Sequence, residues 1–195
     1  MTRPRPLPVD PIAEAHRQWT GHGWGEVADG MAAVTSLVRA QQIVMARVDE
    51  ALKPTGLTFS RYELLQLLSF SRTGALPMAK ASARLQVHPT SVTNTVDRLE
   101  AAGLVVRVPH PSDRRATLIE ITDAGRELVA EATAALNAQV FAEPGLPHDK
   151  IRELLTLLAR FRHDAGDFEE PGEPNLAFHA TWRPESESPA DALGS

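Results

Sequence analysis

Apolar residues in this chain recur at helical spacing on both sides of one short segment in which they alternate. Residues 104–109 alternate and are rich in Val, residues 110–115 are polar, and residues 117–121 alternate again. Such a pattern is typical of two strands joined by a turn. Apolar residues at three- and four-residue steps predict helices over 12–20, 29–52, 61–71, 78–86, 89–102, 123–141 and 148–164. This order of elements constrains the fold more than any other feature.

Capping residues and helix breakers set the predicted ends of the central elements. Ser60 and Glu63 have the spacing of a capping box, which would open the helix that follows. Pro89 suits a first helical position, and Gly103 suits a left-handed helix end. Thr122 is placed to cap the helix after the second strand. We therefore expect a mainly α fold: a winged helix-turn-helix domain with a two-stranded β-wing, flanked by N- and C-terminal helices.

The helix predicted over 89–102 has an unusual exposed face. Val92, Val96 and Leu99 recur at helical spacing and should face the core. Short hydrogen-bonding side chains and one Arg lie elsewhere on this helix, and an ordinary solvated face would carry Glu and Lys instead. Such groups can contact base edges in a major groove. The residues of this helix predicted to bind DNA are Thr90, Ser91, Thr93, Asn94, Thr95 and Arg98. Arg84, which precedes the helix, is predicted to bind DNA as well. An ordinary polar helix face is the alternative.

The turn between the two predicted strands is more polar and more basic than a minimal hairpin needs. It contains Asp113, Arg114 and Arg115. Asp113 can pair with Arg115 and hold its guanidinium outward, where it would suit a narrow, strongly negative minor groove. The alternative is a surface salt bridge of little consequence.

The distribution of charge matters more than the net charge of −5. Residues 59–121 hold eight basic and five acidic side chains, a net of +3, whereas residues 166–195 hold seven acids and one Arg, a net of −6. The total therefore does not argue against a nucleic-acid partner. Pro-rich residues 1–11 and acidic residues 166–195 are expected to be a disordered arm and a disordered tail.

Several classes of protein lack support in the sequence. With no Cys, the chain cannot form disulfides, Cys-ligated zinc sites or a thiol-based sensor. No apolar run is long enough to span a membrane, and the first eleven residues lack the apolar core of a secretory signal. We find no catalytic, phosphate-binding or metal-ligand motif. We expect a cytoplasmic protein that is not an enzyme and has no cofactor, no metal and no membrane partner.

Residues 90–125, TSVTNTVDRLEAAGLVVRVPHPSDRRATLIEITDAG, resemble the winged helix of the MarR family of bacterial transcription regulators, in a form that looks actinobacterial and has an extra N-terminal helix. The resemblance implies that the helix over 89–102 is the recognition helix. Asp113 and Arg115 match the family's wing motif. The implied organisation is N-terminal dimerisation helices over 12–57, a DNA-binding domain over 58–122 and C-terminal dimerisation helices over 123–165.

The flanking helices also give a physical argument for a homodimer. They carry more apolar residues than one winged helix can cover, and an uncovered face would be an oversized apolar patch. A two-fold pairing would bury them and separate two recognition helices by about one turn of double-stranded DNA, roughly 34 Å. A pseudo-palindromic operator and a repressor are therefore expected. The alternative is a winged helix that binds proteins and not DNA.

Resemblance to the family also implies release from DNA by a small aromatic or anionic effector. The candidate pocket residues are Trp19, Trp24, Arg47 and Tyr62; core or interface packing is the alternative for each. The branch that answers to urate usually has an Asp followed by an Arg on the helix that matches 61–71, and another Arg on the recognition helix. Those places here hold Glu63, Ser69 or Phe70, and Thr95, so urate itself is not expected. Glu63 is assigned to the capping box rather than to a ligand.

Overall fold

The computed structural model describes residues 6–111 and 116–168. Contacts between residues divide the chain into two units, and the boundary in the sequence lies between Glu143 and Pro144. The first unit holds the helix-turn-helix elements and the sheet, and the second holds a single described helix.

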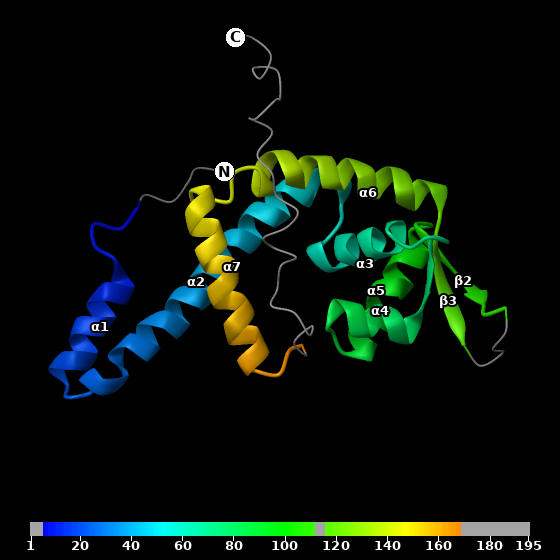
Figure 1. Ribbon diagram of the computed structural model, residues 1–195. Helices are drawn as coiled ribbons and strands as arrows, with labels where there is room; N and C mark the ends of the chain where they lie inside the picture. Colours follow the sequence, from blue (N-terminus) through cyan, green and yellow to red (C-terminus); the bar gives the residue numbers. More distant parts are fainter. Residues whose placement is uncertain (1–5, 112–115, 169–195) are drawn as a thin grey trace, which may run out of the picture. The chain divides into compact units, whose positions relative to one another are not determined.

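Two N-terminal helices pack against each other in the first unit. Helix α1 (Pro11–Gly21) begins with Pro11, and the Asp10 side chain accepts a hydrogen bond from the Ile12 amide at its start. Helix α2 (Gly25–Leu52) lies beside it, and His16 Nε2 is 2.8 Å from Asp29 Oδ1 across the pair (Figure 1). Helix α2 begins at Gly25, four residues before its predicted start at 29. Trp24 is its N-cap and directly follows the turn that ends α1.

The central elements follow in the predicted order, with one addition. A short 3₁₀ turn (Lys53–Thr55) leads to α3 (Phe59–Ser69), α4 (Met78–Leu85), α5 (Pro89–Ala101), β2 (Val105–Pro109) and β3 (Thr117–Ile121). A third strand, β1 (Ala75–Pro77), pairs with β3, so the sheet is antiparallel in the order β1-β3-β2. The two-stranded prediction missed β1 because three residues are too few to show alternation.

The predicted capping box at the start of α3 is wrong. Helix α3 begins at Phe59 with Thr58 as its N-cap, and no side chain caps it. Ser60 already lies inside the first turn, so Glu63 does not occupy the N3 position that the box requires. The Ser60 hydroxyl is 3.2 Å from the Thr58 hydroxyl instead. Glu63 is therefore free of the structural role assigned to it.

The core of this unit lies where α3, α5, α6 and the sheet meet. Val92, Val96 and Leu99 are buried in it, which confirms the predicted inward face of α5. The largest side chains with almost no exposed surface come from every layer: Leu52, Leu64, Leu65, Leu68, Leu99, Ile119 and Leu136. Burial of this face decides which side of α5 remains exposed.

Helix α6 (Asp123–Leu136) is capped by Thr122, whose hydroxyl accepts from the Gly125 amide at 3.0 Å as predicted. Residues Asn137–Phe141 form a π-helical turn rather than the end of a regular α-helix. Arg47 of α2 donates to the Gln139 and Glu143 carbonyl oxygens at 3.1 and 2.6 Å and thereby holds this widened turn.

In the second unit, α7 (His148–Asp164) has the predicted bounds. Leu154, Leu157 and Phe161 are exposed along it. Arg162 Nε donates to Asp167 at 2.6 Å, and its guanidinium lies 5.4 Å from the Phe168 ring. The first residues of the predicted acidic tail therefore pack on α7, while most of that tail lies outside the described residues.

Candidate DNA-binding surface and effector pocket

The turn between α4 and α5 sets the angle at which α5 leaves α4. Gln86 adopts the left-handed conformation, with a φ of 53°. The buried Ser82 hydroxyl donates to the Val87 carbonyl oxygen at 2.7 Å. The His88 side chain then accepts from the Thr90 amide at 3.3 Å, and Pro89 occupies the first helical position, as the sequence predicts. These contacts fix the start of the helix that carries most of the predicted DNA-binding residues.

The face of α5 opposite the core is exposed and polar. Thr90, Ser91, Thr93, Asn94 and Arg98 are all exposed. The Thr93 hydroxyl donates to the Pro89 carbonyl oxygen at 3.0 Å. Its hydrogen is therefore used within the helix, and its oxygen lone pairs are what it can offer to a base or to water. Asn94 and Arg98 carry the donors that can reach beyond the helix surface.

Thr95 differs from its neighbours. It is half-buried, and its hydroxyl donates to the Ser91 carbonyl oxygen at 2.9 Å. Thr95 lies toward α3 rather than on the fully exposed face. Arg84 is exposed in the last turn of α4, near the start of α5.

The wing is described up to Pro111 and again from Ala116. The His110 amide donates to the Ala116 carbonyl oxygen at 3.1 Å and closes the base of the turn. Arg114 and Arg115, predicted to reach DNA from the wing, and Asp113, predicted to orient Arg115, lie outside the described residues.

Arg107 of β2 makes a contact that the sequence analysis missed. Its backbone amide donates to Glu100 Oε1 at 3.1 Å, and its guanidinium donates to both Glu100 and Asp97 of α5. The hydrogen bond to Asp97 raises the pKa of Arg107, outweighing partial desolvation, and Glu100 adds to the rise. Two acids three residues apart on a helix, followed by Arg on the next strand, are the signal that could have predicted this contact.

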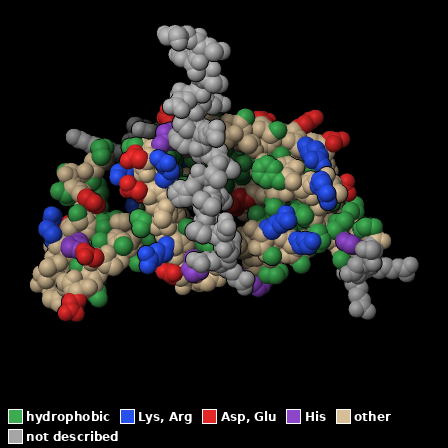
Figure 2. Space-filling view, viewed as in Figure 1, with side chains coloured by type: hydrophobic (Ala, Val, Ile, Leu, Met, Phe, Trp, Pro, Cys, Tyr) green, Lys and Arg blue, Asp and Glu red, His purple; other side chains and the backbone are tan. Residues whose placement is uncertain are grey.

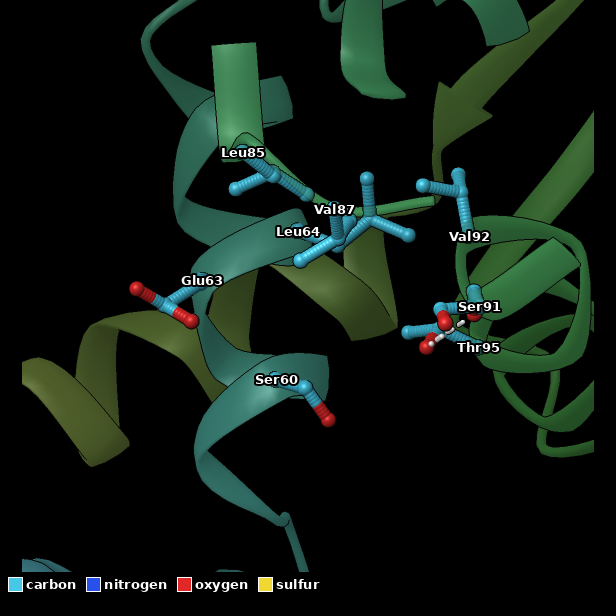
Figure 3. Close-up of a pocket in the computed structure, with 8 residues that line it drawn as sticks. All are labelled: Ser60, Glu63, Leu64, Leu85, Val87, Ser91, Val92 and Thr95. Carbon is cyan, nitrogen blue, oxygen red and sulfur yellow. Dashed lines mark hydrogen bonds between the residues drawn. The ribbon is translucent and has the colours of Figure 1, made fainter. Parts of the chain in front are cut away.

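A pocket of about 110 Å³ lies between α3, the α4–α5 turn and α5 (Figure 3). Figure 3 shows Ser60 and Glu63 on the α3 side, Ser91 and Thr95 on the α5 side, and apolar side chains between them. Desolvation raises the pKa of Glu63 above its usual value. The pocket is lined by Ser60, Glu63, Leu64, Leu85, Val87, Ser91, Val92 and Thr95. None of these side chains is basic.

The four residues predicted to bind an effector do not line this pocket. Trp19 and Trp24 contact each other edge to face, with ring centroids 5.4 Å apart, beside the start of α2. Arg47 lies about 34 Å along the same helix from Trp24, at 1.5 Å per residue. Tyr62 is buried, 6.1 Å from the Phe59 ring between centroids. Of these four residues, the structure of the single chain brings together Trp19 and Trp24 alone.

Sequence reasoning missed Glu63 as a pocket residue because the capping box had accounted for it. Its place in the pattern that resembles the urate branch was the signal that pointed to it, together with Thr95. Both of these side chains line the pocket.

Among residues 6–111 and 116–168, no group of three or more His, Asp or Glu side chains is arranged to hold a metal ion. No helix in the same part of the chain is long and apolar enough to cross a membrane.

Comparisons with known proteins identify the family. The MarR family model matches residues 55–116, which include α3, α4, α5 and β2. The structure of Sco5413, a MarR family transcriptional regulator from Streptomyces coelicolor, is 51% identical, with a TM-score of 0.65. The alignment covers 73% of this chain and 99% of Sco5413. The chain belongs to the MarR family. It is therefore a transcription regulator with a winged helix-turn-helix that binds DNA, and not an enzyme.

Two similar structures of MarR family proteins are complexes with a small molecule or with DNA. CouR from Rhodococcus jostii RHA1, bound to p-coumaroyl-CoA, is 31% identical, with a TM-score of 0.58 over 69% of this chain and 92% of that one. The transcriptional repressor CouR bound to a 23-mer DNA duplex is 28% identical, with a TM-score of 0.59 over 65% of this chain and 89% of that one.

Proposed function

We propose that this MarR protein is a homodimeric repressor that binds a pseudo-palindromic operator and leaves it when a small molecule binds. The observation that carries the proposal is the arrangement of α5. Its apolar side chains are buried in the core, while Ser91, Asn94 and Arg98 are exposed together on the opposite side. A helix presented in this way can enter a major groove and contact base edges.

The proposed contacts divide by chemistry. Asn94 and Arg98 would read base edges, because an amide and a guanidinium each offer paired hydrogen-bonding groups to bases. Arg84 would bind phosphate, which positions the helix without reading sequence. In the wing, Arg114 and Arg115, the latter oriented by Asp113, would reach the minor groove. The DNA complex of CouR, at 28% identity, supports a duplex partner.

Exposed apolar side chains on the N-terminal helices support the homodimer. Of the 28 residues of α2, only Ala28, Val48, Ala51 and Leu52 are buried. Figure 2 shows hydrophobic side chains at the surface over α1 and the adjoining end of α2. The large exposed apolar side chains of α2 are Val27, Val34, Leu37, Val38, Ile43 and Val44. A second copy covering them would produce the two-fold symmetry that a palindromic operator mirrors.

The pocket between α3 and α5 is the proposed effector site. Its lining includes Ser91 and Thr95 of the recognition helix, so an occupant would contact the helix that must fit the groove. A volume of about 110 Å³ suits a fragment of roughly one aromatic ring. Since Glu63 is the one ionisable side chain among the described residues that line it, the pocket favours a neutral aromatic group over an anionic one. The CouR complex with p-coumaroyl-CoA supports a small-molecule effector that has an aromatic part.

The test is an electrophoretic shift assay with the region upstream of the chain's own gene. We expect a sequence-selective complex that weakens as salt rises and that a small aromatic effector dissociates. A reporter driven by the same region should rise when the gene is deleted. A chain that binds neither this region nor any duplex from a random library would instead be a protein-interaction module.

A further inference from the structure

Arg107 is a basic residue of the DNA-binding domain whose hydrogen-bonding groups are directed at its own protein. Its guanidinium donates to Asp97 and Glu100, and its amide adds a third contact at 3.1 Å to Glu100. The Arg107 side chain is only 29% exposed. Both terminal nitrogens of the guanidinium are engaged by carboxylates, and the two acids offset its positive charge.

The two acids lie on the helix that is to enter the groove. Asp97 immediately precedes Arg98 and lies one turn from Asn94, and its side chain is 55% exposed. A carboxylate beside the DNA backbone repels it, because phosphates carry one negative charge per about 1.7 Å of duplex axis. Such repulsion is several-fold stronger near a protein surface than in bulk water, because the effective dielectric constant is lower there.

We infer that Arg107 is a positioning residue that acts on DNA binding through Asp97 and Glu100, by holding their carboxylates on the wing side of α5 and neutralising them. It does not itself contact DNA. This inference rests on the proposed recognition role of α5. It explains how a helix with two acids among its last turns can approach a polyanion.

Two other roles for Arg107 make different predictions. If Arg107 contacted phosphate directly, its loss would weaken binding equally whether or not the two acids were present. If it were only a mechanical brace between β2 and α5, removing the acids would break the brace and weaken binding as well. If Arg107 instead acts by neutralising Asp97 and Glu100, its loss weakens DNA binding only while these two acids remain.

The experiment uses four versions of the full-length chain: wild type, Arg107→Gln, Asp97→Asn with Glu100→Gln, and all three substitutions together. The probe is the duplex that wild-type protein enriches from a randomised library. We expect Arg107→Gln to lose at least about tenfold in affinity. The version without the two acids should stay within about threefold of wild type, and the triple variant should recover to within about threefold.

Two controls keep the result interpretable. Arg98→Gln changes an exposed position on α5, the helix that carries both acids, and should lower DNA affinity. Adding Asp97→Asn and Glu100→Gln to this variant should not restore that affinity. Thermal melts must show that all versions are folded at the assay temperature. Equal losses on removing Arg107 in both backgrounds, or a triple variant no better than Arg107→Gln, would overturn the inference. If wild type enriches no duplex, the proposed function fails instead.

Discussion

At the scale of single residues, a position accepts no side chain larger than that of Gly where another backbone segment lies close to its Cα. Gly125 is buried at the start of α6, and a Cβ there would lie 2.2 Å from the Leu104 carbonyl oxygen and 2.8 Å from Ile121 Cγ1. The first contact is with backbone, which cannot turn aside as a long side chain can. The Thr122-x-x-Gly125 pattern thus joins a cap to a close approach between α6 and the segment before β2.

Gly125→Ala should therefore destabilise the fold by roughly 2–3 kcal/mol, the usual cost of overpacking a tight site. The matched control is Gly30→Ala within α2, where a Cβ meets nothing within 4 Å. That change should stabilise by about 0.5–1 kcal/mol, because Ala is the better helix former. Denaturant unfolding measures both, and equal effects from the two substitutions would contradict the packing argument.

Glu63 gives a second prediction at this scale. Desolvation raises the pKa of its carboxyl in the folded state, so the folded chain holds this proton more tightly than the unfolded chain. Stability should then fall as pH rises from the usual value of 4.5 through the raised pKa, and the deficit should persist above it.

Glu63→Gln removes this titration, so it should be more stable than wild type at pH 7, with the difference vanishing below about pH 4. Glu127→Gln, at an exposed position on α6, serves as the matched control for a Glu-to-Gln change away from the pocket. Melting temperatures between pH 4 and 8 measure the effect. A constant difference across that range would contradict it.

At the scale of elements, most boundaries follow from local chemistry, and the exceptions arise from contacts distant in sequence. Pro89, Gly103 and Thr122 act as their residue types predict. The end of α6 does not, because Arg47, 92 residues from Gln139, bonds carbonyl oxygens of a π-helical turn. No pattern within residues 137–143 indicates that partner.

Arg47→Ala should loosen this turn and lower the free energy of unfolding by about 1–2 kcal/mol, since two hydrogen bonds from a charged donor are lost at a partly solvated site. Hydrogen exchange should accelerate in residues 137–143 before it does in the core strands. Arg39→Ala, on the same helix, where the Arg donates to Gln42 within the described part of the chain, should leave both measurements nearly unchanged. Unaltered exchange in Arg47→Ala would show that the turn holds without its cap.

At the scale of the whole molecule, the proposed homodimer depends on the exposed apolar face of α2. Leu37 and Val38 lie in this face, 42% and 50% exposed in the single chain. Their replacement should disturb assembly without opening the core of the protomer.

The pair Leu37→Asp and Val38→Asp should convert a dimer into monomers and lower operator affinity by about 10²–10⁴-fold, because the second half-site contact is no longer intramolecular. Light scattering and a shift assay measure the two effects. Phe70→Asp, at a 79% exposed apolar position on the end of α3, is the control and should remain dimeric. Retained dimers in the Leu37 and Val38 variant would place the interface elsewhere.

Sequence alone determined the order of the elements, the inward face of α5 and the cap at Thr122. Each depends on local periodicity or on side chains within a few residues of one another. The same local reasoning failed at Glu63, because Ser60 and Glu63 match the capping-box pattern although the helix begins two residues earlier, with Thr58 as its N-cap. It also failed at β1, whose three residues form a strand only because β3 offers a partner.

Tertiary structure alone decided which charged and aromatic side chains meet. Arg107 joins Asp97 and Glu100, Glu63 joins Thr95 around a pocket, and Trp19 joins Trp24 at a distance from Arg47 and Tyr62. A pattern along one element reports which side of that element is buried. It does not report which other element covers it, because that depends on how the whole core packs.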